Sequence, residues 1–132
     1  MARLHDVVFD CRHPASLARF WAAVLDGYQV APYDEAELAR LRAMGIHDPE
    51  DDPSVLVEAA AGQPRIFFQL VTEQKIAKNR VHLDLRCDCL DKEVQRLREL
   101  GARVVSEYAD HRLLRDPEGN EFCLSEAMSL TS

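Results

Sequence analysis

Residues 6–27 read DVVFDCRHPASLARFWAAVLDG, and this stretch predicts a strand, a turn and a helix in that order. Its first six positions are rich in residues that favour strands. Apolar side chains then recur at helical spacing, and Phe20 and Trp21 lie on this apolar stripe. Pro14 suits the first turn of a helix, and Gly27 suits its end. We therefore expect a helix that covers a core with one face, with Phe20 and Trp21 in that core.

The same order returns in the second half of the chain. Residues 81–87 read VHLDLRC, which predicts a strand, and residues 92–101 read KEVQRLRELG, which predicts a helix that ends at a glycine. Apolar positions of the two helices, Trp21 with Leu97 among them, superpose at one common offset. A shared offset and a shared order of elements indicate an internal duplication.

Three short runs of strand-forming residues follow each helix, so each half reads βαβββ. The last two runs of the second half are joined by DPEGN at residues 116–120, where proline presets the φ of a turn and Gly119 and Asn120 tolerate positive φ. We expect one α+β domain over residues 1–132. Its module one covers residues 1–75 and its module two covers residues 76–132, and the two form a curved mixed sheet around a cavity.

The first half contains one insertion, at residues 34–46, which reads DEAELARLRAMGI. Asp34 and Glu37 have capping-box-like spacing, and an apolar stripe follows, so we expect an inserted short helix. The acidic, proline-broken residues 47–53 then predict a surface loop. An insertion at a cavity rim fits a lid, and cover for the sheet edge accounts for it equally well.

The composition disfavours several classes of protein. The 132 residues include 16 Lys and Arg against 23 Asp and Glu, and the formal charge of −7 repels nucleic acid and anionic lipid. A charged residue interrupts any N-terminal signal core, and no stretch approaches the roughly 18 apolar residues of a membrane span. No phosphate loop or dinucleotide fingerprint is present. We expect a cytoplasmic protein that binds neither nucleic acid nor membrane.

The four cysteines are expected to be reduced thiols, because a chain of this size with a normal core does not need disulfides. Cys87 and Cys89 have a spacing one residue short of the usual zinc knuckle, and no second Cys or His pair follows at a matching distance. We therefore interpret the two as strand-end cysteines on opposite faces.

Alternation along the strands identifies side chains that point into a cavity. His82 shares a face of the fifth strand with Asp84, and Gln69 shares a face of the fourth strand with Phe67. Cys123 lies on the last strand, where we interpret it as a small apolar residue rather than a nucleophile. We expect these five residues to bind a small-molecule ligand, and we assign no residue a catalytic role.

Three motifs carry a resemblance to a known family. They are LARFWAAVL at residues 17–25, NRVHLDL at residues 79–85 and DPEGNEFCL at residues 116–124. Together with the duplication, they resemble the glyoxalase/bleomycin-resistance family of the vicinal oxygen chelate superfamily, in its glyoxalase-like branch. The resemblance spans nearly the whole chain and implies the glyoxalase/bleomycin resistance/dioxygenase fold. It also implies a homodimer.

Enzymes of this family hold a divalent metal with up to four side chains, and the resemblance maps these positions onto Asp6, Gln69, His82 and Cys123. Only His82 is the residue that the family pattern leads us to expect. An amide oxygen is a weak ligand and a thiolate favours softer metals, so this set suits zinc at best. We do not favour a metal cofactor, and we interpret His82 as a pocket histidine that hydrogen-bonds a neighbour such as Asp84 or Gln69.

Two functions are therefore kept open. The first is a metal-independent small-molecule-binding protein of the antibiotic-binding or resistance type, like a bleomycin resistance protein, and loss of the ligand set favours it. The alternative is a metal-dependent lyase, isomerase or dioxygenase that uses His82 as a metal ligand or general base. A third possible function is that of a non-catalytic interaction module, and only the acidic loop at residues 47–52 supports it.

Overall fold

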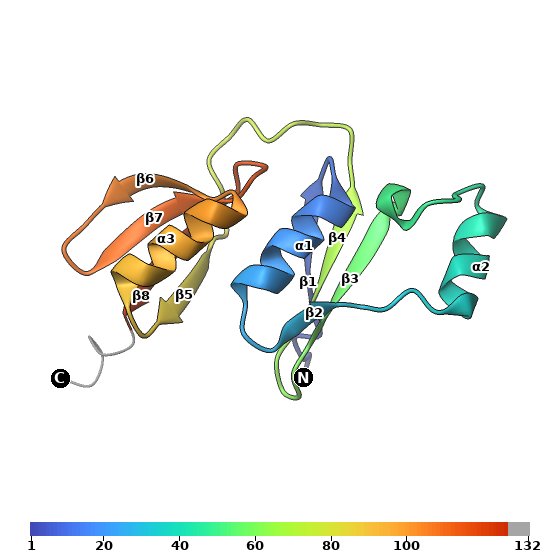
Figure 1. Ribbon diagram of the computed structural model, residues 1–132, viewed down its shortest axis with the longest axis horizontal. Coiled ribbons are helices and arrows are strands. Elements are labelled where there is room, and N and C mark those ends of the chain that lie inside the picture. The colour runs from blue at the N-terminus through green and yellow to red at the C-terminus, as the bar shows by residue number, and fades with distance from the viewer. Residues whose placement is uncertain (127–132) are drawn as a thin grey trace. The chain divides into compact units, whose positions relative to one another are not determined.

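Figure 1 shows a computed structural model, which describes residues 1–126. The chain divides into two compact units, Met1–Gln74 and Lys75–Ser132. Each unit has one four-stranded mixed sheet and the order strand, helix and three strands, with a short helix α2 and a 3-10 helix η1 inserted in the first unit. The predicted α+β class with a duplicated βαβββ pattern is confirmed, and each module forms its own hydrogen-bonded sheet.

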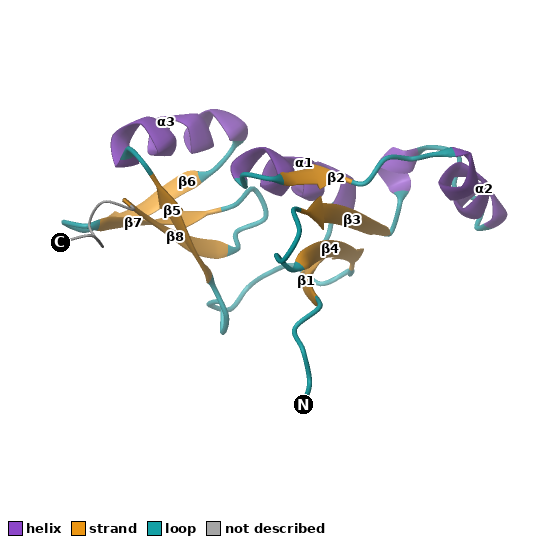
Figure 2. Cartoon of the chain, turned by 90° about the horizontal axis from the view of Figure 1, so that it is seen from below, coloured by secondary structure: helices purple, strands orange, loops and turns teal. Residues whose placement is uncertain are grey.

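The first unit consists of β1 (Asp6–Cys11), α1 (Pro14–Val24), β2 (Tyr28–Val30), α2 (Glu35–Ala43), η1 (Pro49–Asp51), β3 (Ser54–Ala59) and β4 (Arg65–Leu70). The sheet order is β1-β4-β3-β2, with β1 parallel to β4 and the other pairs antiparallel. Val57 and Phe68 are buried on the face that α1 covers (Figure 2). Leu56 and Phe67, one position away on each strand, therefore point to the opposite face.

The second unit consists of β5 (Leu83–Cys87), α3 (Leu90–Leu100), β6 (Arg103–Glu107), β7 (His111–Arg115) and β8 (Glu121–Glu126). Its sheet order, β5-β8-β7-β6, repeats that of the first unit, and β5 is parallel to β8. Helix α3 contacts β6 and β8. Its Leu97 is fully buried, as are Leu114 and Phe122 of the sheet, so one face of this sheet forms a core with the helix.

The aromatic residues of α1 lie in the core, as the sequence predicts. Phe20 and Trp21 are 5% and 1% exposed, and their rings meet edge to face with centroids 5.4 Å apart. Phe9 of β1 lies between Trp21 and Phe68, with ring centroids 5.5 and 5.2 Å away. Leu97, which matches Trp21 in the duplication, is buried in the second unit.

Three element boundaries differ from the sequence prediction. Strand β5 begins at Leu83, so His82 lies just before the strand. Strand β2, which the sequence predicts over residues 28–33, ends at Val30 because a proline, which has no amide hydrogen, follows two residues later. Helix α3 begins two residues earlier than expected, at Leu90, because the Glu126 carboxylate accepts a hydrogen bond from the Leu90 amide at 2.8 Å.

Helix α2 is shorter than the insertion predicted at residues 34–46. The predicted cap is present, since Asp34 Oδ1 accepts a hydrogen bond from the Glu37 amide at 2.9 Å. The helix ends before Gly45, which has a φ of +79° that only glycine adopts readily. The acidic loop that follows is not wholly exposed as predicted, because Asp52 is only 3% exposed.

The DPEGN turn is closed by the side chain of Asp116. Its Oδ1 accepts hydrogen bonds from the amides of Glu118 and Asn120, both at 2.9 Å, and its Oδ2 accepts one from the Asn120 side chain. Gly119 has a φ of +89°, and within residues 1–126 only glycines have a positive φ. Asn120 therefore stabilises the turn through its side chain rather than through the positive φ that the sequence suggested.

The helices of the described chain are too short or too polar for any of them to cross a membrane. All four cysteines lie within residues 1–126, and they are present as thiols. Cys87 ends β5, whereas Cys89 lies beyond the strand and directly precedes α3. Cys87 is therefore a strand-end cysteine as predicted, whereas Cys89 is the residue before a helix.

Candidate functional site

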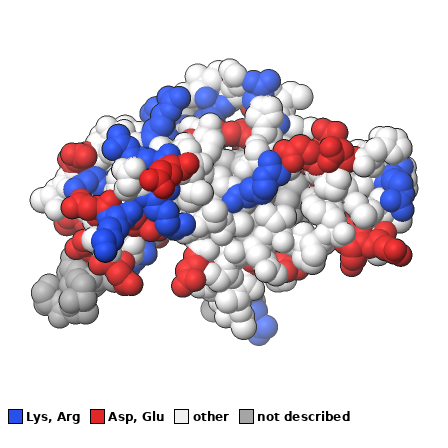
Figure 3. All heavy atoms as spheres, viewed as in Figure 1, with Lys and Arg blue, Asp and Glu red and all other residues white. Residues whose placement is uncertain are grey.

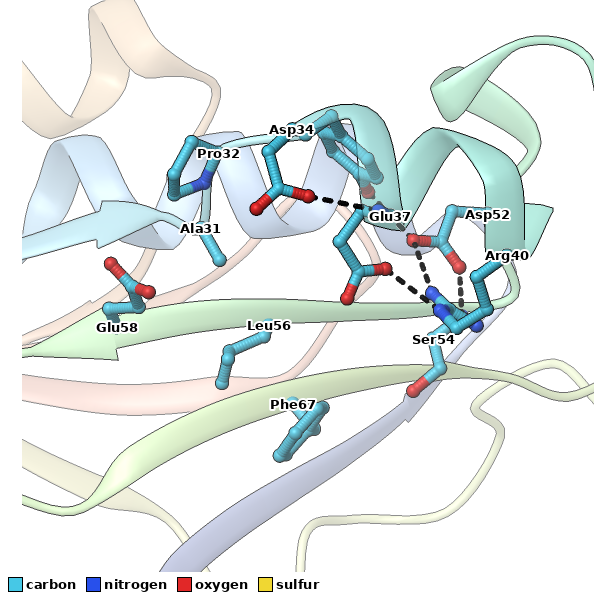
Figure 4. Close-up of a pocket in the computed structure, with 11 residues that line it drawn as sticks. Ala31, Pro32, Asp34, Glu37, Arg40, Asp52, Ser54, Leu56, Glu58 and Phe67 are labelled. Atoms are coloured by element: carbon cyan, nitrogen blue, oxygen red, sulfur yellow. Dashed lines mark hydrogen bonds and ion pairs between the residues drawn. The ribbon is translucent and has the colours of Figure 1, made fainter.

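The face of the first sheet opposite α1 carries a pocket of about 460 Å³. Small-molecule sites commonly have volumes of about 300–1,000 Å³. Helix α2 lies along one side of the pocket, above β3 and β4 (Figure 4). The lining residues are Ala31, Pro32, Tyr33, Asp34, Glu37, Arg40, Asp52, Ser54, Leu56, Glu58 and Phe67.

The apolar floor of this pocket follows from strand pairing. Leu56 of β3 and Phe67 of β4 are opposite each other in the antiparallel register. Arg65 lies 5.3 Å from the centre of the Phe67 ring, and its charge is balanced by the carboxylate of Asp6. The floor therefore offers an aliphatic and an aromatic side chain next to each other, with Glu58 two residues beyond Leu56 on the same face.

A network of hydrogen bonds and ion pairs connects α2 to Asp52, which directly follows η1. Arg40 Nε lies 2.8 Å from Glu37 Oε2, and Arg40 Nη2 lies 3.9 Å from Asp52 Oδ2. The buried Asp52 also accepts hydrogen bonds from the Tyr33 hydroxyl at 2.7 Å and the Ser54 amide at 3.0 Å. Burial, together with the bond to Asp52, raises the pKa of the Tyr33 phenol, so Tyr33 stays a neutral donor.

A second pocket, of about 180 Å³, lies on the second unit and includes His82 and Cys123 in its lining. Asp84 pairs with Cys123 in the parallel register of β5 and β8. His82 Nε2 lies 3.2 Å from Asp84 Oδ1. One ligand atom from each of these three residues lies within 4.8 Å of the others, which is close enough for the three to bind one metal ion together.

The donors of this cluster fit a borderline metal. Imidazole, carboxylate and thiolate are all zinc ligands, and three protein ligands are typical of sites that keep one position open. Burial and the nearby carboxylate of Asp84 raise the pKa of Cys123, so a bound ion would have to displace the thiol proton. The side chains of His82 and Asp84 are 51% and 79% exposed, so their ion pair by itself adds little stability.

The structure places the other two predicted metal ligands apart from each other. Asp6 is opposite Arg65 and accepts hydrogen bonds from that guanidinium at 2.9 and 3.1 Å, which lowers the pKa of Asp6. Gln69 is opposite Asp10, four register positions further on, a distance of about 13 Å along the strands. Phe67 lines the pocket of the first unit, whereas Gln69 is exposed outside its lining.

Several residues of both pockets were not predicted from the sequence. In the second pocket, the His111 ring stacks on Tyr108, with centroids 4.5 Å apart and planes 9° from parallel. His111 Nδ1 lies 2.7 Å from Asp110 Oδ1. In the first pocket, Glu58 could have been predicted, because strand alternation places it on the same face as Leu56. No pattern in the sequence indicates that Asp52 is buried.

Cys87 is expected to resist alkylation in the folded protein. Burial, with the carboxylates of Glu93 and Glu126 nearby, raises the pKa of Cys87 to about 11. The thiolate is the reactive form, and only a small fraction of Cys87 is thiolate at pH 8. Alkylation of Cys87 by iodoacetamide at this pH should therefore be about 100-fold slower than in the unfolded chain. The rate should rise as the pH approaches 11. Peptide mass spectrometry measures this, with the exposed Cys89 as the control, and equal labelling of both native thiols would contradict it.

Comparisons with known proteins agree on one fold. A family model described as a glyoxalase-like domain matches residues 6–125. The chain is similar to a glyoxalase/bleomycin resistance protein/dioxygenase family enzyme from Burkholderia phytofirmans, at 20% identity and TM-score 0.64, covering 95% of this chain and 98% of that one. It is also similar to the fosfomycin resistance protein FosX from Mesorhizobium loti, at 15% identity and TM-score 0.64, covering 95% and 91%. No curated protein matches the chain.

Proposed function

Because this chain belongs to the glyoxalase-like domain family of the vicinal oxygen chelate superfamily, we propose that it is a small-molecule-binding protein whose ligand lies in the pocket between α2 and the first sheet. The pocket itself carries this proposal. Its volume of about 460 Å³ suits a drug-sized molecule, its floor is apolar, and its rim is polar.

A role of the antibiotic-binding or resistance type is supported by the structural neighbours. One is the fosfomycin resistance protein of Mesorhizobium loti, and another is the fosfomycin resistance protein of Listeria monocytogenes, at 10% identity and TM-score 0.64 over 96% of this chain. A metal-independent protein of the antibiotic-binding type would act by sequestering a compound. We propose that the chain does so in the cytoplasm as a homodimer, and sedimentation at several concentrations tests the dimer.

Replacing Phe67 by alanine should weaken ligand binding. A neutral fluorescent probe, the dansyl amide of pentylamine, is expected to bind the wild-type pocket with increased emission. Phe67→Ala removes the aromatic part of the floor, so the affinity should fall about 10-fold. Fluorescence titration measures it, with circular dichroism to verify folding.

Val8→Ala is the control for this experiment, because Val8 is paired with Phe67 in the sheet, is 51% exposed and does not line the pocket. Its affinity for the probe should equal that of the wild type. Unchanged binding in a folded Phe67→Ala protein would show that the probe lies elsewhere, and the proposed pocket would be wrong.

The cluster of His82, Asp84 and Cys123 favours a second candidate, a metal-dependent enzyme. These three side chains would hold a divalent ion, which when bound would polarise the oxygens of a chelating substrate. His111 lines the same pocket, and the carboxylate of Asp110 beside it orients the ring through Nδ1, which leaves Nε2 to face a substrate. Stacking on Tyr108 holds the imidazole plane in place. Metal binding by the wild type and by His82→Ala separates this candidate from the first.

A further inference from the structure

The pocket beneath α2 has an excess of negative charge. Its lining includes one guanidinium, that of Arg40, and four carboxylates, those of Asp34, Glu37, Asp52 and Glu58. One positive and four negative groups leave a formal charge of −3 around the pocket. In the view of Figure 3, acidic side chains also gather over η1 and beside α2. An anionic ligand would therefore meet repulsion at this site.

The single cation of the lining is already balanced. Arg40 forms a close ion pair with Glu37 and lies near the buried Asp52. Asp52 in turn accepts hydrogen bonds from Tyr33 and Ser54. This network stabilises the position of α2. The positive charge of Arg40 is balanced by Glu37 and Asp52, so the lining provides no cation for its other two carboxylates.

Glu58 and Asp34 are those remaining carboxylates. Within residues 1–126, neither forms an ion pair with a lysine or arginine. Glu58 Oε2 accepts one hydrogen bond from the neutral Gln29 amide at 3.3 Å. Asp34 uses Oδ1 to cap α2, and its second oxygen takes no part in that cap. Both carboxylates are therefore available to a cationic group on a ligand.

The apolar floor lies directly beside one of these carboxylates. Figure 4 shows Leu56 between Glu58 on one side and Ser54 on the other, with Phe67 below and Glu37 above. A ligand whose body covers Leu56 and Phe67 would bring a group at its end to Glu58. Carboxylate and aromatic faces are both favourable partners for an organic cation, and the apolar floor favours a flat body.

We infer that this pocket selects amphipathic organic cations, molecules with a flat apolar body and a protonated or quaternary amine. The inference rests on the proposed function, because it names the ligand class of the same pocket. The apolar body occupies the floor at Leu56 and Phe67. The amine lies at Glu58, and Asp34 is the second carboxylate of the lining that is available to it.

Three dansyl amides that differ only in the end of one alkyl chain test this selection. They are the amides of pentylamine, which is neutral, of 1,5-diaminopentane, which is cationic, and of 6-aminohexanoic acid, which is anionic. The wild-type protein should bind the cation about 10-fold more tightly than the neutral probe, and the anion more weakly than either. Raising NaCl from about 0.05 to 0.5 M should reduce the preference for the cation.

Glu58→Gln should reduce the preference for the cation about 3- to 5-fold while leaving the affinity of the neutral probe unchanged. Asp34→Asn should act in the same direction, since asparagine still caps the helix. Glu35→Gln is the matched control, because Glu35 belongs to α2, carries the same charge and does not line the pocket. The control should retain the full preference.

The outcomes are separable. If the cation and the neutral probe bind the wild type equally, or if Glu35→Gln lowers the preference as much as Glu58→Gln, the ligand class is wrong while the proposed binding function stands. If none of the three probes binds, the proposed function fails, and the ligand class fails with it. A preference that depends on Glu58 and on salt supports both.

Discussion

Replacing His82 by alanine is expected to lower the affinity for Zn²⁺ at least about 100-fold, if the cluster in the second unit is a metal site. His82 supplies the imidazole of a three-residue donor set, and its Nε2 lies 3.2 Å from the carboxylate of Asp84. Removing it leaves one carboxylate and one thiol, which are too few to hold the ion. Competition with a chromophoric chelator measures the affinity.

A histidine outside the cluster provides the control for this experiment. His47 lies in the loop after α2, in the first unit, and His47→Ala should bind Zn²⁺ like the wild type. Co²⁺ adds a direct test of Cys123, because a thiolate ligand produces a charge-transfer band that Cys123→Ser should abolish. Wild-type protein that does not bind either ion at micromolar concentration would eliminate the second candidate function and leave ligand binding by the first unit.

Trp21→Ala is expected to lower the free energy of unfolding by about 3–5 kcal/mol. Trp21 is 1% exposed, and its ring contacts Phe9 and Phe20 at 5.5 and 5.4 Å, so truncation leaves a large cavity between α1 and the sheet. Urea unfolding followed by circular dichroism measures the loss, because Trp21 is the only tryptophan and fluorescence would lose its reporter.

Trp21→Phe is the matched variant, since it keeps an aromatic ring and should cost clearly less than alanine. A loss below about 1 kcal/mol for Trp21→Ala would contradict the packing described above. Trp21→Ala should also weaken binding of the neutral dansyl probe. The reason is that one sheet presents Val57 and Phe68 to α1 on one face and Leu56 and Phe67 to the pocket on the other.

The helices and much of the core could be predicted from local patterns in the sequence. The stripe with Phe20 and Trp21 predicted α1 and its buried face, and the duplication predicted a matching helix with Leu97 inside. These features depend on residues a few positions apart, so periodicity and capping residues reveal them. Element ends were less certain, because contacts such as the Glu126 cap of α3 come from distant parts of the chain.

The site residues could be predicted only in part. His82, Asp84 and Cys123 were proposed from strand parity and from the family resemblance, and the structure brings them together. Asp6 was proposed from the resemblance alone, and Arg65, 59 positions away in the chain, binds its carboxylate. Neither strand parity nor a motif reveals such a partner, because the partner depends on which strands pair and in which register.

The sequence by itself determined the α+β class, the repeated βαβββ order, the family and the aromatic core of α1, because each depends on local periodicity or on motifs in a fixed order. The tertiary structure alone decided that Asp52 is buried, that Arg40 of α2 lies 3.9 Å from its carboxylate, and that Tyr33 donates a hydrogen bond to it. These properties depend on pairs of residues from different elements, and folding brings such pairs together through strand register and helix packing, which local sequence does not encode.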